Sequence, residues 1–184
     1  MTRIAVILGS IRPNRVGGEV ADWVVAKASS VDGVEAELVD IAAFNLPVFA
    51  EETPPMMAAP KDPAGIAFNE ALASYDAYIF VTPEYNFSIP GALKNAIDFI
   101  VPSNLANKAV GLVGYSYSHG YQPLAHLRDV LVNFTTGVVG PQVTLSLATD
   151  VVDGAFSPAS THERKFAGMV EAIVTQDKAL STLR

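Results

Sequence analysis

The chain has 184 residues, of which 50% are hydrophobic and 17% are charged. A chain of this length and composition folds around a sizeable core and is not intrinsically disordered. It contains no cysteine, which excludes disulfides, thiolate metal sites, redox dithiols and a cysteine nucleophile. The formal net charge of −7 argues against general nucleic-acid binding, because that function needs a basic surface.

The N-terminus opens with a short apolar run at residues 4–8. This run is too short for the apolar core of a signal peptide, and no stretch of the chain approaches the ~20 apolar residues of a membrane span. We therefore expect a cytoplasmic protein with neither a membrane nor a nucleic acid as its partner.

Strand-like apolar runs alternate along the chain with segments of helical periodicity. The predicted strands are 3–8, 34–41, 77–82, 108–114 and 142–147. The predicted helices are 17–30, 63–73, a third that begins near Pro90 and keeps Ile100 and Val101 on its apolar face, a fourth marked by apolar positions from 124 to 134, and a fifth marked from 166 to 180. Four prolines between residues 45 and 62 forbid a regular element there and predict a surface excursion.

Strict alternation of five strands and five helices predicts a doubly wound parallel sheet, because each right-handed crossover places a helix over the sheet. We expect one α/β domain over residues 1–184. In such a sheet, ligands bind beyond the carboxyl ends of the strands. The loops after the first, third and fourth strands therefore concentrate the candidate functional residues.

The loop after the first strand has the features of an anion site. It runs from Gly9 to Gly18, directly before a helix whose first N–H groups favour a phosphate. Ser10 adds a hydroxyl, and Arg12 and Arg15 add charge-assisted hydrogen bonds. The alternative is an ordinary turn with solvated arginines, and neither a P-loop nor a GxGxxG motif is present.

The loop after the third strand is stiff and aromatic. Residues 83–98 read PEYNFSIPGALKNAID, and the backbone donors beside an aromatic face suit a planar heterocycle with an amide-like edge. The alternative is a rigid connector with a surface tyrosine. Glu84 alone is weak support for general acid or base chemistry.

The loop after the fourth strand reads GYSYSHGY over residues 114–121, and it contains half of a hydrolase nucleophile elbow at Ser116. The three histidines, His119, His126 and His162, are isolated and show no metal-ligand spacing. We predict structural or solvated histidines and no metal site.

Two motifs together resemble one known family. Gly9-Ser10-x-Arg12 before the first helix, followed by Pro83-Glu84-Tyr85-Asn86-x-Ser88-x-Pro90-x-x-Leu93-Lys94-Asn95, is similar to the flavodoxin-like NAD(P)H-dependent FMN reductases, a family that includes quinone, azo-dye and chromate reductases. The resemblance implies a flavodoxin-like sheet in the order 2-1-3-4-5, with helices on both faces.

The resemblance also implies bound FMN, with NADPH or NADH as substrate. The FMN phosphate would lie at Ser10, Arg12, Arg15, Val16 and Gly17, and the ring would lie against Pro83, Glu84, Tyr85 and Asn86, with Ser116, His119 and Gly120 on the far loop. Family members place helices of two subunits around each flavin, so the resemblance implies a homodimer or homotetramer that reduces small-molecule acceptors.

The chain departs from the family pattern at two positions. Arg15 stands where many members have serine, which predicts a phosphate held more by charge than by hydroxyl groups. The bulkier loop at residues 116–121 replaces a glycine-rich one and predicts a narrower site or a different second substrate.

The expected activity consists of two half-reactions at one flavin: hydride arrives from NAD(P)H, and an acceptor such as a quinone or a flavin then takes the electrons. No catalytic acid or base is assigned. One alternative is a flavin-binding electron carrier or redox-sensing scaffold. Another is a serine hydrolase in which Ser116 acts with His162 and either Asp150 or Asp153.

Overall fold

The computed structural model describes residues 1–184. Its strands are β1 (Thr2–Leu8), β2 (Val34–Asp40), β3 (Ala77–Pro83), β4 (Ala109–Ser116), β5 (Gly137–Val138), β6 (Val143–Ser146), β7 (Val151–Val152) and β8 (Ala155–Phe156). Its α-helices are α1 (Gly17–Ser29), α2 (Pro63–Ala73), α3 (Gly91–Asp98), α4 (Tyr121–Leu131) and α5 (Ser160–Leu180). Short 3-10 helices follow at η1 (Ile41–Phe44), η2 (Pro102–Asn104), η3 (Val132–Phe134) and η4 (Ser181–Leu183).

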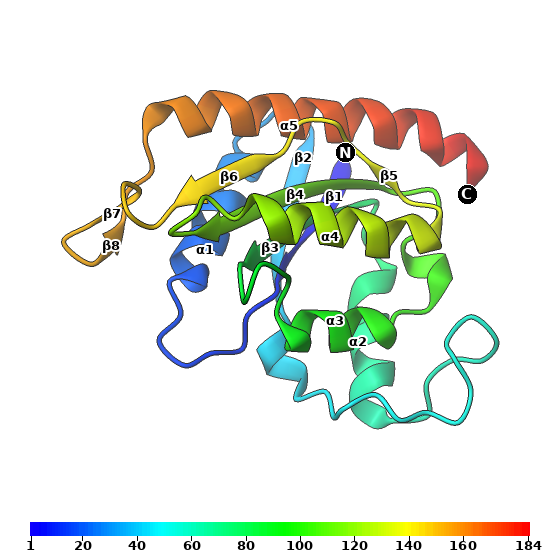
Figure 1. Cartoon of the computed structure of the whole chain (residues 1–184). Helices are drawn as coiled ribbons and strands as arrows, with labels where there is room; N and C mark the ends of the chain where they lie inside the picture. The colour runs from blue at the N-terminus through cyan, green and yellow to red at the C-terminus, as the bar shows by residue number, and fades with distance from the viewer.

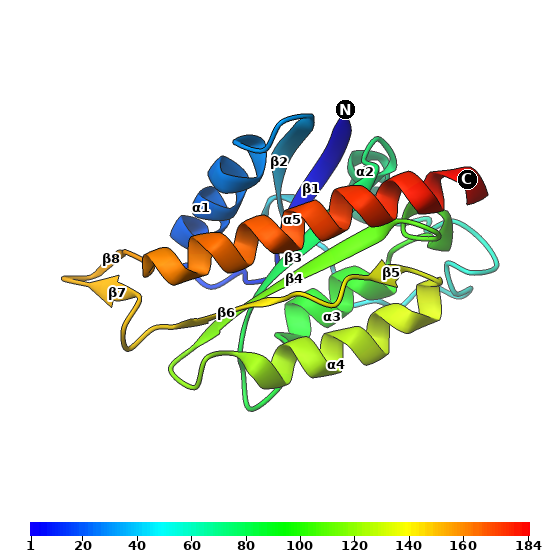
Figure 2. The same ribbon diagram turned by 90° about the horizontal axis from the view of Figure 1, so that it is seen from above.

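The main sheet is parallel and has the strand order β2-β1-β3-β4-β5, with β6 also paired to β4. The predicted order 2-1-3-4-5 is therefore confirmed. The long helix α5 crosses one face of the sheet beside α1, whereas α2, α3 and α4 lie on the other side (Figures 1 and 2).

Helices on both faces explain why the central strands are almost continuously apolar. Every residue of β3 and β4 is buried. Alternate residues of the strands point to opposite faces and build two core clusters of similar size, 22 residues on the α1/α5 side and 21 on the α2/α3/α4 side. The sheet is thus covered on both sides, and only its ends remain for a ligand.

The predicted fifth strand, 142–147, corresponds to β6, and a short strand that was not predicted, β5, pairs with β4 just before it. Gly140 and Pro141 separate β5 from β6, and the proline has no N–H to donate to β4. The Arg128 guanidinium, from α4, donates to the carbonyl oxygen of Val139 at 3.0 Å and to Oε1 of Gln142 at 3.0 Å, which satisfies polar groups at the break.

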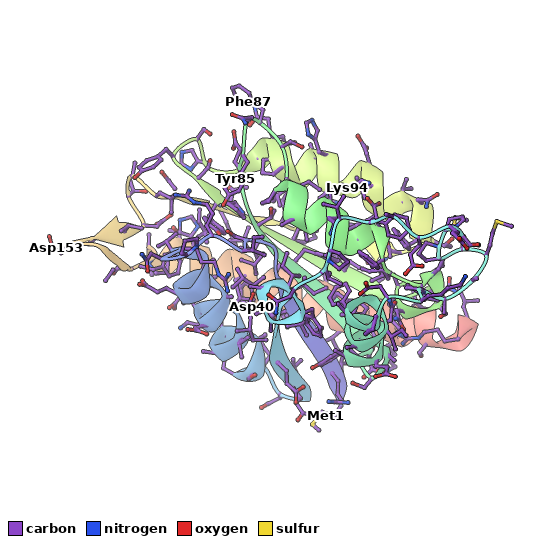
Figure 3. All side chains as sticks on the ribbon, turned by 90° about the horizontal axis from the view of Figure 1, so that it is seen from below. Met1, Asp40, Tyr85, Phe87, Lys94 and Asp153 are labelled. Carbon is purple, nitrogen blue, oxygen red and sulfur yellow. The ribbon has the colours of Figure 1, made fainter.

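Two further differences from the predicted elements have local causes. Helix α3 ends at Asp98, so Ile100 and Val101 lie beyond it instead of on its apolar face; the former is buried in the α2/α3/α4 cluster. The hairpin formed by β7 and β8 was not expected. Its turn uses Asp153 and Gly154 with positive φ angles of 51° and 83°, and Asp153 lies at its projecting tip (Figure 3).

The proline-rich excursion at residues 45–62 is irregular, as predicted, but it is fastened at both ends. The Asn95 side chain, on α3, accepts from the N–H of Phe49 at 2.8 Å and donates to the carbonyl oxygen of Pro47 at 2.7 Å. Oε1 of Glu51 accepts from the N–H groups of Lys61 and Asp62 at 2.9 and 2.8 Å, which closes the base of the loop. No helix of the structure combines the length and apolar character needed to cross a membrane.

Candidate flavin and nucleotide site

Three loops meet where β1, β3 and β4 end. They connect β1 to α1, β3 to α3 and β4 to α4. Each loop follows a strand whose carboxyl-terminal residues are buried. Figure 3 shows that the β3–α3 loop carries Tyr85 at its base and Phe87 at its outer tip. The parallel sheet therefore brings together segments that are about 30 residues or more apart in the chain.

The β1–α1 loop has the chemistry of an anion site. Ser10 is buried, and its hydroxyl lies 3.1 Å from the hydroxyl oxygen of Tyr85, whereas Arg12 is exposed. Val16 occupies the N-cap position of α1, where no side chain caps the helix. In the first turn of α1 the N–H of Gly18 makes a long bond of 3.4 Å to the Arg15 carbonyl oxygen, and the N–H groups of Gly17 and Glu19 are left for another acceptor, beside two arginines.

Gly17 is required by close packing. It is buried, and a Cβ built on it would overlap the hydroxyl oxygen of Tyr115 from β4. An ordinary phenol is already protonated at neutral pH, and burial raises the pKa of Tyr115 further, so its hydroxyl is neutral. The first turn of α1 therefore packs directly against a neutral hydroxyl at the carboxyl end of β4.

Asp40 is a site residue that sequence reasoning missed. Its carboxylate pairs with the Arg15 guanidinium and also accepts from the N–H of Ala42 at 3.0 Å, which caps η1. Asp40 is the last residue of β2, adjacent to Leu8 of β1 in the sheet register. The sequence did offer one signal for Asp40: it is an acidic residue at the end of the second predicted strand, and the predicted sheet order places that strand beside the first.

The β3–α3 loop folds into a tight turn. The N–H of Tyr85 donates to the carbonyl oxygen of Ser88 at 2.9 Å, and the reverse bond is 3.0 Å long. Asn86 and Phe87 between them both have positive φ, at 50° and 63°. Asparagine tolerates this conformation, but an exposed phenylalanine there is uncommon and strained. The turn sets Tyr85 inward and Phe87 outward (Figure 3).

Ser116 is the hub of the β4–α4 loop. Its hydroxyl oxygen accepts from the N–H groups of Gly120 and Ser118 at 2.7 and 3.0 Å, and its hydroxyl donates to Oε2 of Glu84 at 3.0 Å. The Ser118 hydroxyl donates to the same carboxylate at 3.1 Å. His119 and Gly120 have positive φ angles of 69° and 67°, so the loop turns sharply over the end of β4.

These loops line one pocket of about 410 Å³. Eight of the twelve predicted site residues line it: Ser10, Arg12, Arg15, Val16, Pro83, Glu84, Tyr85 and Ser116. The other four, Gly17, Asn86, His119 and Gly120, belong to the same loops but do not line the pocket. Four lining residues were not predicted: Asn14, Tyr115, Tyr117 and Leu147.

The hydrolase alternative does not match the arrangement of its three residues. The Ser116 hydroxyl donates to Glu84, not to a histidine. His162 lies with its Nε2 3.3 Å from Oδ1 of the buried Asp150, and its Nδ1 is buried without a partner. Asp153 lies at the tip of the β7–β8 hairpin. No hydrogen bond links the nucleophile to its base.

The remaining histidines are solvent-facing. His119 is exposed, and Nδ1 of His126 lies 3.0 Å from the Ser88 hydroxyl, which links α4 to the β3–α3 turn. No group of three or more His, Asp or Glu side chains is arranged to hold a metal ion.

The donor set of the pocket fits a flavin mononucleotide. Arg12, Arg15, the Ser10 hydroxyl and the uncapped N-terminus of α1 provide cationic and neutral donors for a phosphate. Tyr85 provides an aromatic wall for a ring, while the N–H groups of Glu84 and Tyr85 are bonded to the carbonyl oxygens of Tyr115 and Ser88. Fold and site together define a flavodoxin-like α/β protein with a phosphate-binding pocket at the carboxyl ends of its strands.

Comparison with known proteins identifies the family. The family model described as NADPH-dependent FMN reductase matches residues 2–150, so the chain belongs to this family. An NAD(P)H-dependent FMN reductase, ntnL, from Nectria sp is 36% identical, with 100% of this chain and 96% of that protein covered. A quinone reductase of Escherichia coli (strain K12) is 30% identical over 71% of this chain and 69% of its own length.

Solved structures agree on the fold. FerB, a flavoenzyme NAD(P)H:(acceptor) oxidoreductase from Paracoccus denitrificans, superposes with a TM-score of 0.74 at 23% identity and covers 97% of this chain and 98% of its own. The protein is therefore an FMN-dependent oxidoreductase that uses NAD(P)H, as the two loop motifs indicated.

Proposed function

We propose that the FMN lies in the pocket formed by the β1–α1, β3–α3 and β4–α4 loops. Its phosphate would lie at Ser10, Arg12, Arg15, Val16 and Gly17, and its ring along Pro83 to Asn86, with Ser116, His119 and Gly120 on the far side. The observation that carries this proposal is that eight of these residues, from three separate loops, line a single pocket.

The residues of the chain bind and orient, while the cofactor carries the electrons. Bound FMN supplies two-electron transfer between NAD(P)H and an acceptor. Arg12 and Arg15 neutralise the phosphate, and the ion pair with Asp40 holds the second guanidinium in place. Glu84 fixes the hydroxyls of Ser116 and Ser118, so its role is to order the loop rather than to transfer a proton.

The acceptor in this proposal is a small oxidised molecule, a quinone or a free flavin. The support is the similarity to a quinone reductase and to an FMN reductase, named above. We further propose that residues 1–184 act as one unit, assembled as a homodimer or homotetramer in the cytoplasm. The apolar side chains left exposed around the loops, such as Phe87 and Tyr117, support an assembly of this kind.

Anaerobic mixing of the FMN-loaded protein with NADPH or NADH tests the function. Rapid loss of the oxidised-flavin absorbance, followed by its recovery on addition of a quinone, is expected. An electron carrier would retain its FMN but be reduced by either nucleotide only slowly. A protein that binds no FMN at all would contradict the proposal.

Substitution of Arg15 tests the placement of the phosphate. Arg15→Ala removes a charge-assisted hydrogen bond worth roughly 1.5–3 kcal/mol, so the Kd for FMN should rise about 10- to 100-fold. Riboflavin, which has no phosphate, should bind the variant and the native chain within threefold. The matched control is Arg164→Ala, an exposed arginine on α5. Equal losses for FMN and riboflavin would show that Arg15 does not bind the phosphate.

A further inference from the structure

A second pocket, larger than the flavin pocket, lies on the other side of the β1–α1 and β3–α3 loops. It has a volume of about 610 Å³, within the range of small-molecule sites. Its walls come from four segments: the β1–α1 loop, η1, the start of the proline-rich excursion and the N-terminal turn of α3. The lining residues are Ile11, Ile41, Ala42, Asn45, Leu46, Val48, Gly91, Ala92 and Asn95.

The two pockets share their dividing walls. Ile11 lines the larger pocket, whereas its neighbours Ser10 and Arg12 line the flavin pocket. The loop that carries Glu84 and Tyr85 on the flavin side leads directly into the start of α3 on the other side. A molecule that binds with one end at the flavin can therefore place its other end in this pocket.

The lining of the larger pocket is mostly apolar and carries no charge, and its only polar side chains are those of Asn45 and Asn95. Six of its nine residues are hydrophobic, and no charged side chain lines it. The Asn95 amide already donates to the Pro47 carbonyl and accepts from the N–H of Phe49, so it has little to offer a polar ligand. A phosphate or a nucleotide finds no cation here. The chemistry selects a hydrocarbon group.

Apolar side chains also stay open to solvent around this pocket. Ile11 is 55% exposed and Val48 is 86% exposed, so a hydrocarbon group that covered them would remove apolar surface from water. We propose that this pocket binds the aliphatic side chain of a quinone whose ring is reduced at the flavin. The proposal rests on the proposed function, because it needs a quinone acceptor, and it adds the substrate class: quinones with a hydrocarbon chain.

The test compares benzoquinones that share one head group and carry either no chain, a four-carbon chain or a ten-carbon chain. Each fully buried methylene can raise kcat/KM up to about fourfold. The native protein should therefore reduce the ten-carbon quinone with a kcat/KM at least about tenfold above that of the chain-free quinone.

Two substitutions should abolish this preference by different means. Gly91→Phe places a ring in the pocket, and no atom stands within 4 Å of a Cβ at this position. Val48→Asp adds a charge at the rim, on a side chain so exposed that folding should be unaffected. In both variants the ratio of kcat/KM values should fall below threefold.

Matched controls should keep the full chain-length preference. Gly168→Phe is the same change on α5, on the opposite face of the sheet, where a Cβ also meets nothing. Val132→Asp places the same charge on another exposed valine, in η3.

The outcomes separate the two proposals. Equal kcat/KM values for all three quinones in the native protein, or a preference that survives both substitutions, would overturn the side-chain pocket and leave the quinone reductase function intact. Reduction of the bound flavin by NADPH without turnover of even the chain-free quinone would overturn both. A change in molecular mass in Gly91→Phe, measured by light scattering, would assign the pocket to a subunit contact instead.

Discussion

Gly17 shows how one missing Cβ determines the site. The first turn of α1 lies so close to Tyr115 that any side chain at position 17 would overlap the phenol oxygen. The neighbouring Gly18 has no such constraint, because a Cβ there meets no atom within 4 Å. Of these two consecutive glycines, only Gly17 is required by packing.

Substitution of these glycines separates the two cases. Gly17→Ala should destabilise the protein by about 1–3 kcal/mol through overpacking, or displace α1 and weaken FMN binding. Gly18→Ala should be neutral or stabilising, since alanine is the better helix former. Urea unfolding and FMN titration measure both effects.

Removal of the opposing hydroxyl provides the rescue. In the double variant Gly17→Ala/Tyr115→Phe, the overlapping oxygen is absent, so most of the lost stability should return. If the stability losses of the two single substitutions were strictly additive in the double variant, the Tyr115 hydroxyl would not be the group that clashes with a side chain at position 17.

At the scale of elements, the β4–α4 loop is held by one buried hydroxyl. Ser116→Ala would leave the N–H groups of Gly120 and Ser118 without their acceptor, at a cost of about 1–3 kcal/mol. Ser118→Ala is the control, because that exposed hydroxyl contacts only the Glu84 carboxylate and the Ser116 hydroxyl and accepts from no backbone N–H group. Hydrogen exchange of residues 117–120 should accelerate in the first variant and stay near native in the second; equal exchange in both would contradict this role of Ser116.

The elements themselves were largely predictable from sequence, because their periodicity and their end signals agree. For example, α2 begins at Pro63 after Asp62, whose carboxylate accepts from the N–H of Ala64, and Phe68 and Leu72 repeat on its buried face. The short strand β5 and the break between it and β6 were not predictable in the same way. The break depends on Arg128, from a different element, satisfying the broken backbone.

The candidate site was predictable where residues are contiguous and less so where they come together in space. The loops that carry Ser10 and Glu84 were identified from contiguous sequence motifs. Asp40, Tyr115 and Leu147 enter the site only because parallel strands end side by side, and single strands give no sign of which residue will face a neighbouring loop.

At the scale of the whole molecule, titratable groups gather at the end of the sheet opposite the flavin pocket. Tyr75 donates to Oε2 of Glu37 at 2.6 Å, and burial, with this carboxylate nearby, raises the pKa of Tyr75 to about 12. Burial also raises the pKa of Tyr78 and lowers that of Lys108, whose ammonium donates to the carbonyl oxygen of Tyr75 at 2.7 Å.

These shifts set how stability changes in alkali. An unfolded tyrosine loses its proton near pH 10, whereas folded Tyr75 keeps it until about pH 12. The stabilising contribution of this residue is therefore complete below pH 10 and is lost as the pH rises toward 12. Lys108 acts in the opposite direction. Because its pKa is lowered in the folded protein, its contribution to the free energy of unfolding increases as the pH rises toward the pKa of an unfolded lysine.

Urea unfolding at pH 9, 10 and 11 isolates the contribution of the tyrosine. The free energy of unfolding of Tyr75→Phe should fall less steeply between pH 10 and 11 than that of the native protein. Tyr117→Phe, at a side chain that is 79% exposed, should follow the native slope. Identical slopes for all three proteins would mean that Tyr75 does not titrate differently on folding.

The fastened excursion has a consequence for how this protein can change. Because Glu51 holds residues 61 and 62, and Asn95 holds residues 47 and 49, the chain between 52 and 60 starts and ends at fixed neighbouring points. Extra length in a loop that is already closed costs little, about 0.6 kcal/mol for each doubling. Within this segment residues 56–59 are all exposed, so they are a suitable insertion point for a peptide tag or a fluorescent probe, and a place where lineages could insert new sequence while the flavin pocket and the sheet stay unchanged.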